Sequence, residues 1–416
     1  MTICERFTYY GIRSTLTIFL MSEQGMNLEL EEALAYFNQF TLIFSLSLLP
    51  MGFLTDVFFG HRRSLILSGA AIAFGCLLAI LLDFEWLRYS LGLIAVGMGW
   101  MHSNLVVGIG NHYTQSGGNR RLGFLFYILA VNLGSFLGAL GTTWVYDSYG
   151  FEWSYLVMMV IILQGTALYA FFSHSKQQST SDETILTERA LEMANLQILD
   201  APEGPQGQQE ERPAPDRTDW QFQLSLVIFA SLMFITSQGL YDFSLTNRLR
   251  DFSSLELLGR ASYFTAYLYV PITILLGLYL YYRPKANSLR LFGSNFLFLA
   301  IGSSLLLLIL TWVNGRSSGI LWLIFLPAIF TNTAENIYSV LAPSLLTRLA
   351  PVAWAATIVG FFSAALRLCR FVVNWVTTRV PGATSLLLIV IVLGILMALV
   401  LSLYQRSEQI EASQQN

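Results

Sequence analysis

Seven ionisable side chains stand inside long apolar runs of the sequence, and they are its first candidates for chemistry. A charge at bilayer depth is costly unless it is paired or hydrated, so such residues commonly mark a substrate or proton pathway. Cationic, anionic and imidazole groups are all represented, so the set can bind both ends of a small zwitterion and exchange protons. The seven are Glu5, Arg6, Arg13, His102, Glu335, Arg367 and Arg370.

The opening stretch ICERFTYYG (residues 3–11) combines a charged pair with two tyrosines. Helical spacing places Arg6, Tyr10 and Arg13 within two turns, so one helix face can carry both arginines and a hydroxyl. Such a face requires a water-filled cavity or an anion. The alternative is an interfacial pair: only four residues precede Glu5, so either the chain begins late or the pair lies shallow. We favour the functional interpretation.

A polar neighbourhood around Glu335 indicates a wet segment inside its apolar run. The neighbours are Thr331, Asn332, Thr333 and Asn336. A glutamate without a partner at this depth would be costly, which favours a functional role. Arg367 and Arg370, one turn apart, fit a gate pair or two side chains snorkelling to the surface equally well. Asp242 stands near the end of its run and is expected to reach the outer surface.

Composition indicates a polytopic membrane protein. Of 416 residues, 55% are hydrophobic and 12% are charged, against roughly a quarter charged in soluble domains. A net charge of −3 without a basic tract excludes nucleic acid as a partner. The three cysteines have no disulfide or metal spacing, and no phosphate loop, catalytic triad or metal cluster is found. We therefore expect no enzyme, no cofactor and no metal.

Twelve apolar runs approach the ~20 residues that span a bilayer as a helix. A stretch rich in Pro, Gln and charge separates the first six from the last six and is expected to be mobile. This gives an all-α membrane fold of two six-helix halves: residues 1–172, a polar linker 173–219, residues 220–404 and a tail 405–416. The expected spans are 3–21, 34–55, 64–82, 86–108, 122–146, 154–172, 220–243, 260–282, 289–312, 317–346, 353–376 and 383–404.

Short loops carry the orientation signal. The segments GHRR (60–63), GGNRR (117–121) and YYRPK (281–285) fall on one side, and acidic loops fall on the other. Lys and Arg favour the cytosol, so both termini and the linker are expected there. The N-terminus lacks a basic region and a cleavage site, so it reads as a retained span and not as a signal peptide. Plasma membrane and endolysosomal membrane are not distinguished.

The loop between the second and third spans, GFLTDVFFGHRRS (52–64), has a distinctive spacing. It resembles the gating loop of major-facilitator carriers, whose two halves rock about a midplane site. Asp56 can cap or pair at a helix end, while Arg62 and Arg63 can bind headgroups or the facing half. A plain basic cytosolic loop is the alternative, but the spacing of Gly52, Asp56 and Gly60 favours a gate.

Four segments resemble the proton-dependent oligopeptide transporter family. ERFTYYG matches its first-helix motif, and FLFYILAVNLGSFLG (124–138) matches its span-five motif, with Asn132, Gly134 and Ser135 in place. SQGLYDFSLTNRLRD (237–251) looks like a diverged span seven that keeps Gln238. AENIYSVLAPSLLTRLAP (334–351) is similar to the span-ten pattern. The resemblance covers nearly the whole chain.

The resemblance implies a role for each matching residue. Glu5 and Arg6 would form the proton-coupling pair, Tyr10 and Arg13 would face a peptide's carboxylate, and Glu335 would receive its amino terminus. Asn132 and Gln238 would line the same site.

Three positions depart from the family pattern. Thr2 replaces the first glutamate of the span-one motif, His102 stands at the span-four lysine, and Ser237 replaces a span-seven glutamate. His102 is either a substitute proton site, since histidine titrates near neutral pH, or a neutral side chain bonded to a neighbouring helix.

These inferences predict a secondary transporter of di- or tripeptides, or of related small zwitterions or anions. It would work by alternating access and would be coupled to protons. Two alternatives stay open. One is a degenerate member of the family that acts as a ligand sensor or scaffold, and the departures at Thr2, His102 and Ser237 favour it. The other is a carrier of a small monoanion, which would need only the arginines. Its partners would be the substrate, protons and the lipid bilayer.

Overall fold

The structure is a computed structural model that describes residues 1–23, 25–81, 86–115, 119–177, 217–252, 270–283, 288–313, 323, 325–377 and 383–414. Nearly all of these residues are helical, and none of them is in a strand. Each of the twelve expected spans overlaps a helix of the described part. The helices are α1 (Thr2–Met21), α2 (Leu30–Leu54), α3 (Gly60–Leu81), α4 (Leu87–Gln115), α5 (Arg120–Tyr149), α6 (Phe151–Gln177), α8 (Arg217–Phe252), a helix over residues 270–282, α10 (Ser288–Val313), α11 (Phe325–Leu349), α12 (Ala355–Thr377) and α13 (Ala383–Gln414).

Several helices extend beyond the apolar runs that predict them. α6 continues to Gln177, α8 begins at Arg217, and α13 continues to Gln414 through most of the expected tail. Polar residues at a helix end keep their backbone hydrogen bonds while their side chains face water, so hydropathy alone places the ends too early. The remainder of the expected linker, 178–216, lies outside the described residues.

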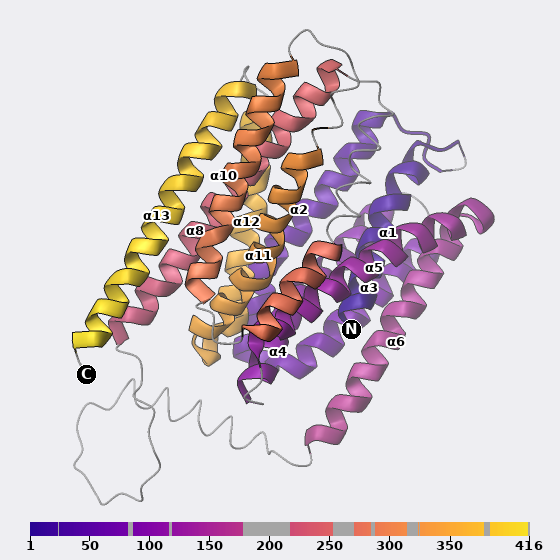
Figure 1. Ribbon diagram of the computed structural model, residues 1–416. Helices are drawn as coiled ribbons and strands as arrows, with labels where there is room; N and C mark the ends of the chain where they lie inside the picture. Colours follow the sequence, from indigo (N-terminus) through magenta and orange to yellow (C-terminus); the bar gives the residue numbers. More distant parts are fainter. Residues whose placement is uncertain are drawn as a thin grey trace, which may run out of the picture.

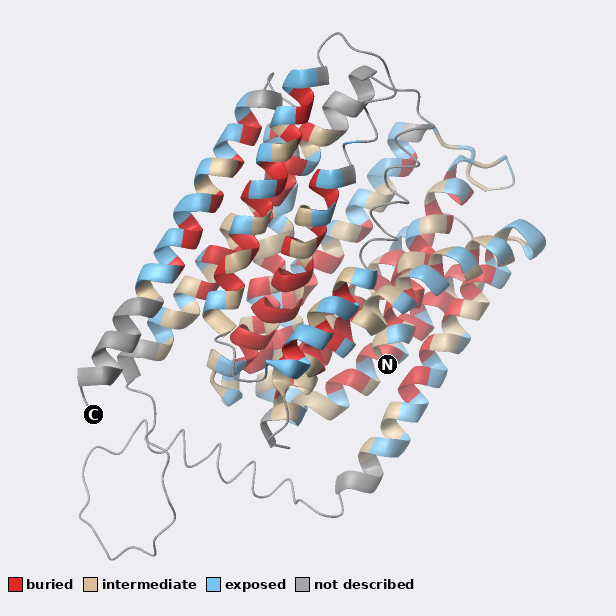
Figure 2. Cartoon of the chain, in the orientation of Figure 1, coloured by how far each residue is buried: buried red, intermediate tan, exposed pale blue. Residues whose placement is uncertain are grey.

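Eight stretches of the described residues are long and apolar enough to cross a membrane, and one of them holds both α2 and α3. Neither α1 nor α11 is among the eight, and these two helices carry Glu5, Arg6 and Glu335. Large apolar side chains such as Phe74, Phe136 and Phe171 are exposed on the outside of the bundle. Figure 2 shows the buried residues where helices face each other. This is the pattern of an integral, multi-pass membrane protein.

The helices pack in two groups that meet along five of the described helices. In the first group α5 packs against α1, and α4 against α2 and α3; in the second, α10 packs against α11 and α13, and α8 against α12 and α13. α12 crosses to α2 and α4, and α11 crosses to α4 and α5. Figure 1 shows α1 and α3 to α6 on one side, α8, α10 and α13 on the other, and α11, α12 and α2 between them.

Glycines on α5 allow α1 to approach closely. A Cβ at Gly134 would overlap the Ile3 carbonyl and the side chain of Arg6, and one at Gly138 would overlap the Phe7 backbone. Gly141 has more room, because the nearest atoms to its Cβ would be Phe7 ring carbons at 3.6 Å. Gly134 and Gly138 therefore form a small-residue contact between α5 and α1, and Gly141 lies beyond it.

Gly138→Val is expected to lower stability by about 1–3 kcal/mol, because α1 must move away from α5 to make room. A thermal melt of the purified protein in detergent measures the loss. Gly141→Ala, three residues further along the same helix, is the matched control and should melt within about 0.5 kcal/mol of the unmodified protein. Equal melting of Gly138→Val and the unmodified protein would contradict the close approach.

Candidate functional site

α1 begins midway along the bundle, so its first turns lie among the other helices (N in Figure 1). Glu5 has no exposed surface and Arg6 is 6% exposed. Arg6 Nε lies 2.7 Å from Glu5 Oε2. Neither that nitrogen nor the two carboxylate oxygens have hydrogen-bond geometry with a partner in the described part of the chain, so charge alone holds the carboxylate. The pair is buried in protein rather than shallow at an interface.

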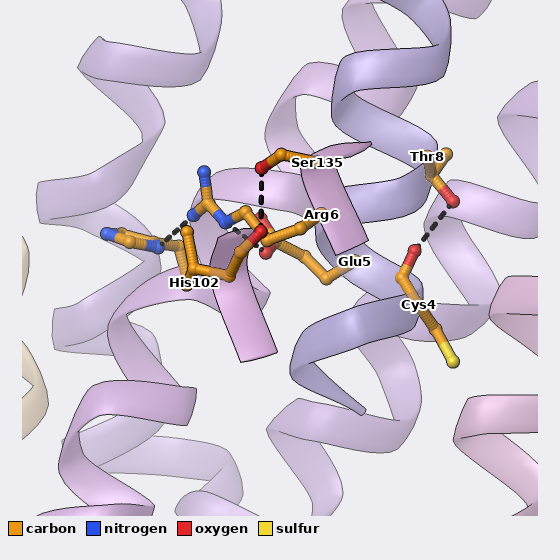
Figure 3. Close-up of polar contacts among 7 residues, drawn as sticks. Cys4, Glu5, Arg6, Thr8, His102 and Ser135 are labelled. Atoms are coloured by element: carbon orange, nitrogen blue, oxygen red, sulfur yellow. Dashed lines mark hydrogen bonds and ion pairs between the residues drawn. The ribbon is translucent and has the colours of Figure 1, made fainter. Parts of the chain in front are cut away.

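His102, on α4, is the second partner of Arg6. Arg6 Nη2 lies 2.6 Å from His102 Nδ1, as Figure 3 shows. A guanidinium has five donors and no acceptor, so Nδ1 must accept and this arrangement requires a neutral imidazole. A proton on Nδ1 would remove the hydrogen bond and bring two cations together. Arg6 is therefore shared between a carboxylate and an imidazole, and each of these can take up a proton.

Aromatic side chains enclose this group. The Arg6 guanidinium carbon lies 5.6 Å from the centre of the Tyr9 ring, and Tyr9 packs against Phe44 of α2 with ring centres 5.5 Å apart. Tyr127 on α5 is 7% exposed and lies close enough to Arg6 and Glu5 for electrostatic interaction. Sequence reasoning did not single out Tyr127, because aromatic residues are abundant here and its nearness to Arg6 depends on how α5 packs on α1.

The other predicted substrate residues of the first half are less closely joined to Arg6. Tyr10 is half-buried, and the Arg13 guanidinium carbon lies 5.8 Å from the centre of its ring. Arg13 itself is exposed. Asn132 is half-buried, and its side-chain nitrogen has no hydrogen-bond partner within the described residues. These groups have donors available for a ligand.

A second charged group forms in the other half around Glu335 of α11. Arg370 of α12 and Asp242 of α8 both interact electrostatically with Glu335, and Gln238 of α8 lies beside it. Gln238 is 6% exposed, and its side-chain oxygen has no hydrogen-bond partner in the described part. Asp242 is exposed, and it also interacts electrostatically with Glu335 from α8.

A polar segment follows on the same helix as Glu335. Asn336 donates to the Asn332 carbonyl at 2.9 Å and accepts from the hydroxyl of the fully buried Thr273. The bond from Thr273 ties α11 to the helix over residues 270–282. Part of the polar segment that was expected to be hydrated therefore makes its hydrogen bonds within the protein.

α12 carries an arginine toward each of the two charged groups. The Arg367 guanidinium carbon lies 4.0 Å from the centre of the Phe44 ring, and Arg367 interacts electrostatically with Glu5, Arg6 and His102. Arg370 faces Glu335 and Asp242. A snorkelling side chain would not stack on a ring that is fully buried. The arrangement of Arg367 therefore differs from that alternative.

The predicted gating residues lie where α2 meets α12. Asp56, in a π-helical turn (Thr55–Phe59), accepts hydrogen bonds from the Ala356 and Thr357 backbone nitrogens at 3.3 and 2.7 Å. The Thr357 hydroxyl also donates to it at 2.7 Å. These nitrogens open α12, so the carboxylate caps a helix of the facing half. Gly60 follows with φ of 69°, a conformation that favours glycine.

Arg62 and Arg63 do not reach the facing half. Arg62 Nε donates to the Ser173 hydroxyl of α6 at 3.0 Å, which is a contact within the first group of helices. Arg63 is exposed. Of the two expected roles, contact with the facing half and binding of lipid headgroups, the second remains a prediction for these arginines.

Comparisons with known proteins agree on the kind of protein. The model of the Major Facilitator Superfamily matches residues 1–374. The peptide transporter YePEPT of Yersinia enterocolitica is 29% identical over 178 residues, which cover 40% of this chain and 35% of that protein. The dipeptide and tripeptide permease A of Proteus mirabilis is 28% identical over 161 residues, covering 38% and 33%. The match thus spans about a third of the length of these curated relatives.

Solved structures share the fold over almost the whole chain. A peptide transporter POT in complex with sulfate has a TM-score of 0.59 at 20% identity, covering 97% of this chain and 93% of that one. A POT family transporter in complex with 5-aminolevulinic acid has a TM-score of 0.62 at 15% identity, covering 98% and 94%. At these identities the likeness shows the fold alone.

Proposed function

This chain belongs to the major facilitator superfamily, and from that premise we propose that it is a member of the oligopeptide transporter family and carries small zwitterions such as di- and tripeptides across a membrane. One observation carries the proposal: a cationic group with Arg6 and an acidic group with Glu335 stand on different halves, and α12 contacts both. A short peptide offers a carboxylate to the first and an ammonium to the second. Alternating access would open this site to each side in turn.

Proton coupling follows from the double contact of Arg6. With Glu5 ionised and His102 neutral, Arg6 is occupied by both. A proton on Glu5 removes the ion pair, and a proton on His102 Nδ1 removes the hydrogen bond. Either event leaves Arg6 donors available for the substrate carboxylate. Proton uptake and substrate binding would then favour each other, which is what a symporter requires.

The same proposal places residues 1–172 and 220–404 as the two moving halves. The linker 173–219 and both termini would lie in the cytosol, as the basic loops favour. Asp56 and Gly52 would then close the cytosolic side against α12. Substituted cysteines at loop residues, labelled from one side of sealed vesicles, test this orientation.

Uptake by the protein in liposomes tests the proposed function. A labelled dipeptide is followed under an inward proton gradient, with and without an ionophore. Accumulation that the ionophore abolishes supports proton-coupled transport. Equilibration without accumulation would leave a carrier and exclude coupling. Binding of the dipeptide without any uptake would favour the sensor or scaffold instead.

Glu335→Gln is expected to weaken binding of a free dipeptide by about tenfold, because an ion pair to the peptide ammonium is lost. An N-acetylated dipeptide, which lacks the ammonium, should bind both proteins equally well. Competition against the labelled dipeptide measures both. Glu152→Gln, which alters an exposed carboxylate at the start of α6, is the matched control.

A carrier of a small monoanion is the second candidate, and the arginines favour it. In the first charged group Arg6 and Arg367 face Glu5, so this group holds two cations and one anion among the described residues. A monoanion would not need Glu335. If Glu335→Gln leaves uptake of every accepted ligand unchanged, this candidate replaces the peptide transporter.

A further inference from the structure

Arg367 reaches from α12 into the charged group of the opposite half. Its guanidinium stacks on Phe44 of α2, whose ring is fully buried. The same ring lies 6.2 Å from the His102 ring, at an angle of 83°. Phe44 therefore holds Arg367 next to the pair that Arg6 and His102 form. α12 contacts α2 along its length because Gly52 and Gly360 let the two backbones approach.

Stacking leaves most of the hydrogen-bonding edge of Arg367 available, with Tyr9 as a hydrogen-bond partner. A guanidinium that lies on a ring uses its face, while its N–H groups point outward in its own plane. Within the described part of the chain, no carboxylate lies at ion-pair distance from Arg367, although Glu5 is close enough for electrostatic interaction. The N–H donors of Arg367 are therefore in position, but no acidic side chain of the described residues forms an ion pair with them.

Arg6 has donors to spare at the same place. Its Nε faces Glu5, its Nη2 faces His102, and Tyr127 is a further hydrogen-bond partner, so the five N–H groups of this guanidinium are not all used. Two guanidinium groups from opposite halves thus converge on a region whose one acidic side chain is Glu5 among the described residues. Such a pair of cations matches a planar carboxylate of a ligand.

We propose that Arg367 and Arg6 together form a carboxylate clamp across the two halves, with Arg367 as the residue that selects ligands bearing a free carboxylate. This inference rests on the proposed function and names the part of the ligand that the site reads. Because the clamp needs a residue from each half, a bound carboxylate also draws α12 toward α1. His102 is neutral beside them, so the second cation comes from α12 and not from α4.

Two ligands that differ only in their C-terminal group test the clamp. The unmodified protein should bind a free dipeptide about tenfold more tightly than the same dipeptide as its C-terminal amide. Arg367→Gln should bring the two affinities within about twofold of each other by weakening the free dipeptide alone. Arg88→Gln is the matched control and should keep the preference, because Arg88 is an exposed arginine at the start of α4 that also lies over an aromatic ring, Tyr36, at 5.1 Å.

Relocating the cation gives a second and independent measurement. His102→Lys in the Arg367→Gln background places an ammonium beside Arg6, and it should restore at least half of the lost preference. If Arg367→Gln does not fold, Arg367→Lys decides, because it keeps the charge and must keep a preference for the free carboxylate. An unchanged preference in Arg367→Gln, or a lost one in Arg367→Lys, overturns the clamp. Failure of the unmodified protein to bind either dipeptide overturns the proposed function instead.

Discussion

Arg6→Gln should be the most damaging single change in the site, with a loss of stability and a loss of binding together. Glu5 has no exposed surface and meets no other cation at ion-pair distance in the described residues, so the substitution leaves only the more distant Arg367 to balance its charge. Breaking a buried ion pair by removing one partner costs about 3–5 kcal/mol. Dipeptide affinity should fall about 100-fold, because the ligand carboxylate loses one of its two guanidinium partners.

A double variant separates the two losses. Glu5→Gln with Arg6→Gln removes both charges and leaves two amides of similar size, so most of the stability should return. The binding defect should remain, because no cation has been restored. Thermal melts in detergent follow the first effect, and calorimetry or competition with a labelled dipeptide follows the second. A double variant that melts as early as Arg6→Gln would mean that packing at Arg6, not its charge, holds α1 in place.

Arg6→Lys tests the geometry of the cation. A lysine keeps the charge, so stability should be close to that of the unmodified protein. It offers a single ammonium in place of a planar fork and does not match Glu5, His102 and a ligand carboxylate in the same way. Binding should therefore stay impaired while stability recovers. Normal binding in this variant would argue that only the charge matters.

The sequence locates most of these groups because an ionisable side chain in an apolar run has few explanations. Glu5, Arg6, His102 and Glu335 stand out by this rule alone, and the twelve apolar runs predict the helices that hold them. Their partners do not follow from the same pattern. The contact of Arg6 with His102 joins residues 96 positions apart in the chain and depends on the packing of α1 beside α4. The orientation of Arg367 depends in the same way on where α12 crosses α2.

The partner of Asp56 at the gate could not be predicted from the sequence either. Its spacing from Gly52 and Gly60 predicts a helix-end contact, but the capped helix begins 300 residues later. Nothing local in GFLTDVFFGHRRS distinguishes a contact with α12 from one within its own half. Arg62 illustrates this, since it belongs to the same loop yet contacts α6. Long-range contacts of this kind require the arrangement of the two halves.

Gly360→Val is expected to abolish transport and to weaken dipeptide binding by about tenfold, because Arg367 follows on the same helix and loses its place on Phe44 when α12 moves away from α2. A Cβ at Gly360 would overlap the Leu48 carbonyl, and a Cβ at Gly52 would overlap the Ala356 carbonyl, so the glycines form a reciprocal contact between α2 and α12. Neither backbone can give way without separating the helices. The cytosolic side is then held open, and Asp56 no longer reaches the nitrogens of Ala356 and Thr357. The protein can no longer alternate between its inward-open and outward-open states.

The distance between the two helix ends measures this directly. Spin labels at Phe58 and Val352, both exposed, report the separation of the loop after α2 from the start of α12 in a background where Cys4, Cys76 and Cys369 are replaced. The unmodified protein should show a short distance in part of its population, and Gly360→Val should lack it. Gly92→Ala is the control, since its added Cβ meets only Ile43 at 3.9 Å. For Asp56→Asn, the share of molecules at the short distance should lie between the shares for the unmodified protein and for Gly360→Val. The amide oxygen still accepts from the helix nitrogens, but it carries no charge to match the helix dipole. Normal uptake by Gly360→Val would show that the α2–α12 contact is no part of the transport cycle.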